Sequence, residues 1–70
     1  MENEINETIL INVNGKVQGV GFRFFTRKAA KQAGGITGYV KNLPDRSVEI
    51  LAQSDTTKLS AFIELIKQGF

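Results

Sequence analysis

The chain contains neither cysteine nor histidine, and this absence narrows the ways in which so short a polypeptide can hold a fold. Without these residues there is no disulfide framework, no thiolate zinc site and no imidazole metal ligand. Its 70 residues allow one domain and one hydrophobic core, which must offset the ordering entropy without covalent support. We therefore expect a single domain of marginal stability, with no metal and no cofactor.

The absence of cysteine and histidine also limits the catalytic mechanisms that the chain can use. A cysteine nucleophile, a Ser-His-Asp triad and an imidazole acid–base shuttle are all excluded by the composition. Any reaction must use arginine, lysine, asparagine, carboxylates, hydroxyl groups or the backbone.

Hydrophobic periodicity predicts five elements in the order βαββα. Alternating apolar residues predict strands over residues 8–14, 36–41 and 47–53, the last two joined as a hairpin by the turn 42–46. Apolar stripes at helical spacing predict a helix over 22–33 and a second one that ends near Gly69. Gly34 and Gly35 supply a left-handed stop for the first helix, and Ser54 or Asp55 can cap the second.

This order predicts an α+β sandwich in which two helices cover one face of an antiparallel sheet. The ferredoxin-like pattern is βαββαβ, so the chain is expected to be a ferredoxin-like α/β sandwich whose final strand is missing. Residues 1–7 are polar and are expected to form a disordered tail, and residues 8–70 are expected to form the domain.

Positive charge gathers in the middle of the chain. No carboxylate lies between Thr8 and Pro44, whereas this stretch contains Lys16, Arg23, Arg27, Lys28, Lys31 and Lys41. Such an unopposed positive field favours an anionic ligand, which could be phosphate, nucleic acid or acidic lipid. A solvated helix face is the simpler interpretation for the basic residues from 27 to 31.

A glycine-rich segment, Gly15–Gly21, lies between the first strand and the first helix, with three glycines in seven residues. Backbone N–H groups in such a loop can converge on an anion, and the helix dipole adds positive potential. It matches neither the Walker pattern, since position 20 is valine, nor the dinucleotide-binding fingerprint. Arg23 follows in the first helical turn, where a guanidinium can bind phosphate bidentately. The alternative is a tight loop beside a surface arginine.

Two segments of this sequence closely resemble the signatures of the acylphosphatase family. They are Gly15–Arg23, followed by Thr26, and Gly38–Asn42, and both occur in the family's order. The resemblance covers roughly residues 8 to 68. It implies an enzyme that hydrolyses the mixed anhydride of a carboxylic and a phosphoric acid, with an acyl phosphate as substrate and inorganic phosphate as product and inhibitor.

The resemblance also implies roles for individual residues. Arg23 would bind the phosphate and Asn42 would orient the attacking water. The backbone N–H groups of the phosphate-binding loop would be those of Gln18, Gly19, Val20, Gly21 and Phe22. An amide can hold a water molecule by hydrogen bonds, and phosphoryl transfer depends mainly on positioning and charge stabilisation. The alternative for Asn42 is a turn residue bonded to its own backbone. Thr26 is expected to bond backward within the first helical turn.

The sequence departs from the family pattern in the hairpin and in length. Arg46 occupies a position where the family usually has glycine, and a positive φ there would store on the order of 1 kcal/mol of strain. In the family a last strand pairs beside the first, so its loss would leave one edge of residues 8–14 unpaired. We expect a monomer, with a risk of association at that edge.

Two other functions remain open: a non-catalytic domain that binds acyl or carbamoyl phosphate, and a small RNA-binding module. RNA-binding sheets stack bases on aromatic side chains, but the strands around residues 9–13 and 48–52 contain none, so we expect no nucleic-acid partner. No apolar run approaches the roughly 20 residues of a membrane span, and the N-terminus is acidic. We therefore expect no membrane partner and a cytoplasmic location.

Overall fold

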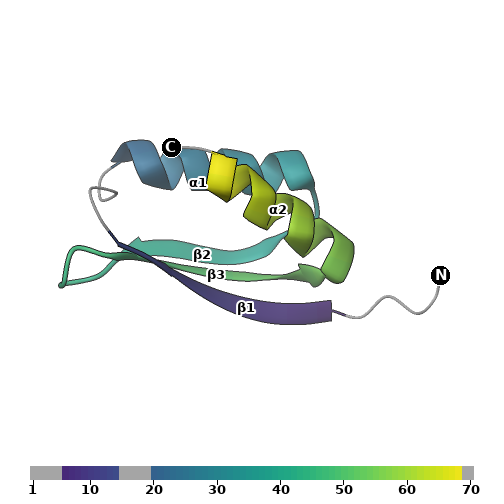
Figure 1. The fold of residues 1–70 in the computed structure, drawn as a ribbon, viewed down its shortest axis with the longest axis horizontal. Helices are drawn as coiled ribbons and strands as arrows, with labels where there is room; N and C mark the ends of the chain where they lie inside the picture. The colour runs from purple at the N-terminus through teal and green to yellow at the C-terminus, as the bar shows by residue number, and fades with distance from the viewer. Residues whose placement is uncertain (1–5, 15–19, 69–70) are drawn as a thin grey trace.

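The computed structural model describes residues 6–14 and 20–68, and the elements follow the predicted βαββα order (Figure 1). They are β1 (Asn6–Val13), α1 (Val20–Ala33), β2 (Thr37–Asn42), β3 (Val48–Asp55) and α2 (Thr56–Gln68). The strands form one antiparallel sheet in the order β1-β3-β2. Both helices lie on the same face of this sheet (Figure 1). The predicted fold class is confirmed.

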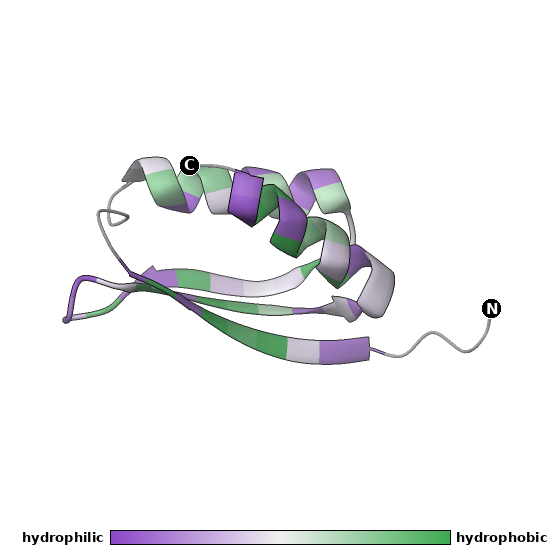
Figure 2. Cartoon of the chain, in the orientation of Figure 1, coloured by the Kyte–Doolittle hydropathy of each residue, from purple (hydrophilic) through white to green (hydrophobic). Residues whose placement is uncertain are grey.

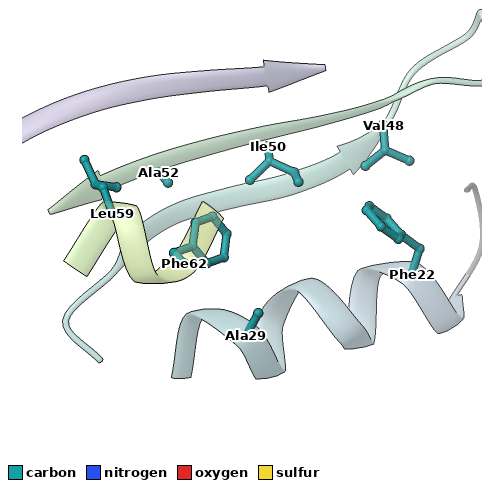
Figure 3. Packing of buried hydrophobic residues seen from close by; sticks show 7 residues of the cluster. All are labelled: Phe22, Ala29, Val48, Ile50, Ala52, Leu59 and Phe62. Carbon is teal, nitrogen blue, oxygen red and sulfur yellow. The ribbon is translucent and has the colours of Figure 1, made fainter. Parts of the chain in front are cut away.

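The core lies between this face and the helices. The central strand β3 turns Val48, Ile50 and Ala52 toward the helices, and all three are buried. Packed against them are Phe22 and Ala29 from α1 and Leu59 and Phe62 from α2 (Figure 3). The alternating apolar residues of β3 and the apolar stripes of the two helices thus form one hydrophobic core, as the sequence predicted.

All three strands and the first helix differ from their predicted boundaries by one or two residues. Asn6 and Glu7, assigned to the disordered tail, are part of β1 because they pair with Asp55 and Ser54 at the far end of β3. Helix α1 begins at Val20, two residues before Phe22, so Gly21 is helical and lies outside the loop to which it was assigned.

The ends of both helices follow the predicted chemistry. Gly34 has a φ of 82° and its N–H donates to the carbonyl of Ala30 at 3.0 Å, which closes α1. Asp55 caps α2, since its carboxylate accepts a hydrogen bond from the backbone N–H of Lys58 at 2.8 Å. The backbone and the ammonium group of Lys58 together hold the pKa of Asp55 below its usual value, against the opposing effect of desolvation.

The turn between β2 and β3 contains a positive φ at Arg46, the position where the sequence departs from the family's glycine. Arg46 has a φ of 74°, a backbone conformation that residues other than glycine and asparagine rarely adopt. Its N–H donates to the carbonyl of Leu43 at 3.0 Å, and the N–H of Leu43 donates to Ser47 at 2.9 Å.

The other face of the sheet is covered by neither helix. The middle of β1 is apolar between polar ends (Figure 2), and its Leu10 is 62% exposed on this open face. Leu10 and Tyr39 both pair with Leu51 of the central strand, from opposite sides. Among the described residues, neither helix is long and apolar enough to cross a membrane.

Candidate active site

Asn42 is the last residue of β2, and the register of the sheet decides which way its side chain points. It pairs directly with Val48, and directly paired residues project to the same face of a sheet. Because Val48 is buried beneath the helices, Asn42 lies on the helix-facing side. Its side chain is exposed and makes no hydrogen bond to another described residue, which is unlike a turn asparagine bonded to its own backbone.

Helix α1 begins at the same end of the sheet. Phe22, the third residue of α1, packs close to Val48 (Figure 3), and Val48 is the partner of Asn42. The first N–H groups of a helix have no acceptor within it and attract anions together with the helix dipole. Val20 and Gly21 contribute such groups. Gln18 and Gly19, also predicted to bind phosphate, lie outside the described residues.

Arg23 is the fourth residue of α1 and is half-buried. Its Nε atom is fully buried and has no hydrogen-bond partner in the part of the chain that the structure describes. A buried donor without an acceptor is costly and rare in folded proteins. A guanidinium with an unused donor beside a helix N-terminus is suited to an anion with several oxygens, such as phosphate.

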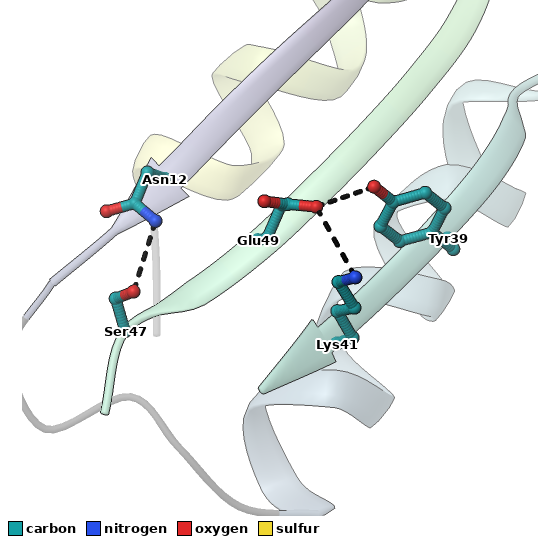
Figure 4. Close-up of polar contacts among 5 residues, drawn as sticks. All are labelled: Asn12, Tyr39, Lys41, Ser47 and Glu49. Atoms are coloured by element: carbon teal, nitrogen blue, oxygen red, sulfur yellow. Dashed lines mark hydrogen bonds and ion pairs between the residues drawn. The ribbon is translucent and has the colours of Figure 1, made fainter. Parts of the chain in front are cut away.

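Hydrogen bonds between polar residues stabilise the turn that follows Asn42, and Figure 4 shows the one between Asn12 and Ser47. Ser47 is fully buried, and its backbone N–H and hydroxyl both donate to Asp45 Oδ1, at 3.0 and 2.6 Å. The amide of Asn12 in β1 donates to the Ser47 hydroxyl at 3.1 Å. The two hydrogen bonds from Ser47 lower the pKa of Asp45. Sequence reasoning missed Ser47 and Asn12, because they are 35 residues apart and only the sheet brings them together.

The side chain of Lys41 lies on the open face of the sheet, opposite to the face of Asn42. It pairs with Glu49 on the open face, where its ammonium group lies 3.9 Å from the carboxylate (Figure 4). The hydroxyl of Tyr39 donates to the same carboxylate at 2.5 Å, and this hydrogen bond raises the pKa of Tyr39. The alternation along β2 thus separates Asn42 from its basic neighbour.

The prediction for Thr26 is corrected. Its hydroxyl oxygen is buried and has no hydrogen-bond partner among the described residues, so it does not bond backward to the first turn of α1. Thr26 instead lines a cleft between α1 and β2. Within residues 6–14 and 20–68, no group of three or more His, Cys, Asp or Glu side chains could hold a metal ion.

The acylphosphatase family model matches residues 9–70 of the chain. The chain belongs to the acylphosphatase family. It is 52% identical over 59 residues to an acylphosphatase of Archaeoglobus fulgidus, an alignment that spans 84% of this chain and 65% of that protein. It is 45% identical over 67 residues to an acylphosphatase of Treponema denticola, which spans 96% of this chain and 70% of the relative.

The fold agrees with solved structures of the same family. The crystal structure of acylphosphatase from Bacillus subtilis superposes with a TM-score of 0.80 at 42% identity, over 93% of this chain and 70% of that one. An acylphosphatase from Coxiella burnetii gives the same TM-score at 35% identity, over 99% of this chain and 74% of that one. The chain spans about two thirds of the length of the relatives that it matches.

Proposed function

We propose that the protein hydrolyses acyl phosphates to a carboxylate and inorganic phosphate. The observation that carries this proposal is the position of Arg23 and Asn42. These residues are 19 positions apart in the sequence, yet the start of α1 and the end of β2 lie at the same end of the helix-facing side (Figure 1). Each of the two acylphosphatase signatures contributes one of them, and they are the side chains to which the resemblance assigns catalytic roles.

Arg23 and the first N–H groups of α1 bind the phosphoryl oxygens in this proposal. The buried Nε of Arg23 supplies one donor that no described residue uses, and Val20 and Gly21 supply helix N-terminal N–H groups. Charge on these oxygens is stabilised by donors that are already oriented before the reaction, which is the main demand of phosphoryl transfer. Gln18 and Gly19 remain predicted members of the loop.

Asn42 orients the attacking water. Its exposed amide can accept a hydrogen bond from the water through its oxygen and donate through its nitrogen. The water oxygen attacks phosphorus, the bond from phosphorus to the bridging oxygen breaks, and that oxygen leaves with the electron pair as a carboxylate. Both protons of the water stay with the phosphate product, which forms as dihydrogen phosphate and then releases a proton to solvent.

The leaving group explains why histidine is dispensable. A carboxylate has a pKa of about 4 to 5, so it departs at neutral pH without a general acid. The remaining requirements are binding of the phosphoryl group and alignment of the water. Holding the two reactants in the right geometry lowers the activation barrier by several kcal/mol. One guanidinium, one amide and a set of backbone N–H groups satisfy these requirements.

The test is hydrolysis of acetyl phosphate and benzoyl phosphate by the wild-type chain and by Asn42→Ala, with a chelator present. We expect Asn42→Ala to lower kcat by about 100-fold, while inhibition by inorganic phosphate is retained because Arg23 is intact. Gln53→Ala is the matched control, since it removes an exposed amide from the opposite face of the sheet. A folded wild-type chain that binds phosphate but turns over neither substrate would instead identify a non-catalytic binding domain.

A further inference from the structure

A cleft of about 300 Å³ runs between α1 and β2 on the helix-facing side of the sheet. Thr26, Arg27 and Ala30 line it from α1, and Ile36 and Val40 line it from the opposite side. The proposed hydrolysis uses none of these five residues. The cleft therefore needs its own explanation.

The cleft lies next to the proposed catalytic residues, because α1 and β2 carry both the lining residues and Arg23 and Asn42. Thr26 and Arg27 follow Arg23 by three and four residues on α1, and residues at these spacings share a side of a helix. Val40 precedes Asn42 by two residues, so both project to the same face of β2. One helical turn, about 5 Å, separates Arg23 from the start of the cleft. The cleft thus begins one turn along α1 from Arg23, on the face of the sheet to which Asn42 also projects.

Thr26 gives the cleft an unused hydrogen-bonding group. The residue is 3% exposed, and its hydroxyl oxygen has no partner among the described residues. A buried hydroxyl in this state destabilises the fold relative to a methyl group of the same shape. A hydroxyl that lines a cleft and lacks a partner in the protein is suited to an acceptor on a bound ligand.

We propose that this cleft binds the acyl group of the substrate and that the Thr26 hydroxyl donates a hydrogen bond to the departing carboxyl oxygen. This inference rests on the proposed acyl phosphate hydrolysis. Negative charge grows on that oxygen as the bond to phosphorus breaks, so the hydrogen bond is stronger in the transition state than with bound substrate. Thr26 therefore acts mainly on kcat.

The lining of the cleft specifies the class of acyl group. Ala30, Ile36 and Val40 form apolar walls, and none of the lining residues is a carboxylate. Arg27 is exposed at the rim and brings a positive charge. The cleft therefore favours apolar acyl groups larger than acetyl, accepts a neutral or anionic far end and disfavours a cationic one.

The experiment measures kcat and KM for acetyl phosphate and benzoyl phosphate in three variants. Thr26→Val removes the hydroxyl and keeps the shape, and we expect it to lower kcat by about tenfold or more for both substrates. The inhibition constant of inorganic phosphate should stay at its wild-type value, because the phosphate site is intact. The melting temperature should not fall, because an unsatisfied hydroxyl has gone.

Ala30→Leu narrows the cleft from the helix side, and Ala61→Leu makes the same change at an exposed position of α2. We expect Ala30→Leu to lower kcat/KM for benzoyl phosphate by about tenfold or more and kcat/KM for acetyl phosphate by much less, because the acetyl group is smaller. Ala61→Leu should alter neither. Far-UV circular dichroism confirms that each variant is folded.

The outcomes separate this inference from the function on which it rests. Hydrolysis of neither substrate by the folded wild-type chain would overturn the proposed function. Wild-type hydrolysis of both, with kcat retained in Thr26→Val and the same substrate preference in Ala30→Leu, would overturn only the acyl subsite. A lower kcat in Thr26→Val that is accompanied by a lower melting temperature would assign Thr26 a structural role and would also overturn the inference.

Discussion

Replacing Gly38 by alanine tests how β2 is held against β3 and hence how Asn42 is placed. Gly38 has a φ of 144° and pairs with Ala52 in the sheet. A Cβ atom at this position would lie 1.8 Å from the backbone oxygen of Leu51 and 2.7 Å from its carbonyl carbon. Real Cβ atoms essentially never approach closer than 3.0 Å, so β2 must move away from the central strand by more than about 1 Å.

The size of the effect follows from what that movement breaks. The six-residue pairing of β2 with β3 would lose hydrogen bonds, and the alanine would also adopt an unfavourable φ. We expect a cost of about 3 kcal/mol or more. A 70-residue domain has a free energy of unfolding of roughly 4 to 10 kcal/mol, so the substitution removes a large share of it.

Gly34→Ala is the matched control. Gly34 also has a positive φ, 82°, but a Cβ there meets nothing within 4 Å, so the cost is only backbone strain of about 1 to 2 kcal/mol. Thermal unfolding followed by circular dichroism measures both variants, with about 4 to 8 °C expected per kcal/mol. Equal losses of melting temperature in the two variants would refute the close approach of Gly38 to Leu51.

Two further predictions concern the hairpin turn and the carboxylates. Arg46→Asn should raise the melting temperature by a few degrees, because asparagine tolerates a positive φ and relieves about 1 kcal/mol of strain; a lower melting temperature than wild type would contradict this. The pKa values of Asp45 and Asp55 are lowered in the fold by their hydrogen bonds, so their contribution is complete above the unfolded-state pKa of about 3.9. It should be lost as the pH falls below that value through the folded-state pKa values, and urea unfolding from pH 6 to pH 2 should show a smaller loss in Asp55→Asn.

Local patterns in the sequence were sufficient to predict much of the fold. The alternation of Val48, Ile50 and Ala52 predicted the buried face of β3. Ser54 or Asp55 was predicted to cap α2 because both precede an amphipathic run, and Asp55 is the one that caps it. The arginine at position 46 also marked the position at which strain was considered, and its φ is positive. Each of these features depends on residues within a few positions of one another.

Features set by distant pairing could not be predicted in the same way. Asn6 joins β1 only because Asp55 lies opposite it, and no local pattern shows this. The hydroxyl of Thr26 was assigned a local acceptor, but helix packing buries it beside a cleft. For the site, the family signatures predicted Arg23 and Asn42, whereas the position of Asn42 on the helix-facing side follows only from the register of β2 with β3.

The most direct test of the central claim is the hydrolysis of benzoyl phosphate by Arg23→Ala, measured with inorganic phosphate as a competing inhibitor. Lys28→Ala is the control, because it removes an exposed cation from the same helix. We predict that Arg23→Ala lowers kcat/KM by about 100-fold or more and weakens phosphate inhibition in parallel, while Lys28→Ala changes neither. An Arg23→Ala variant that keeps the wild-type rate and the wild-type inhibition constant would contradict the account.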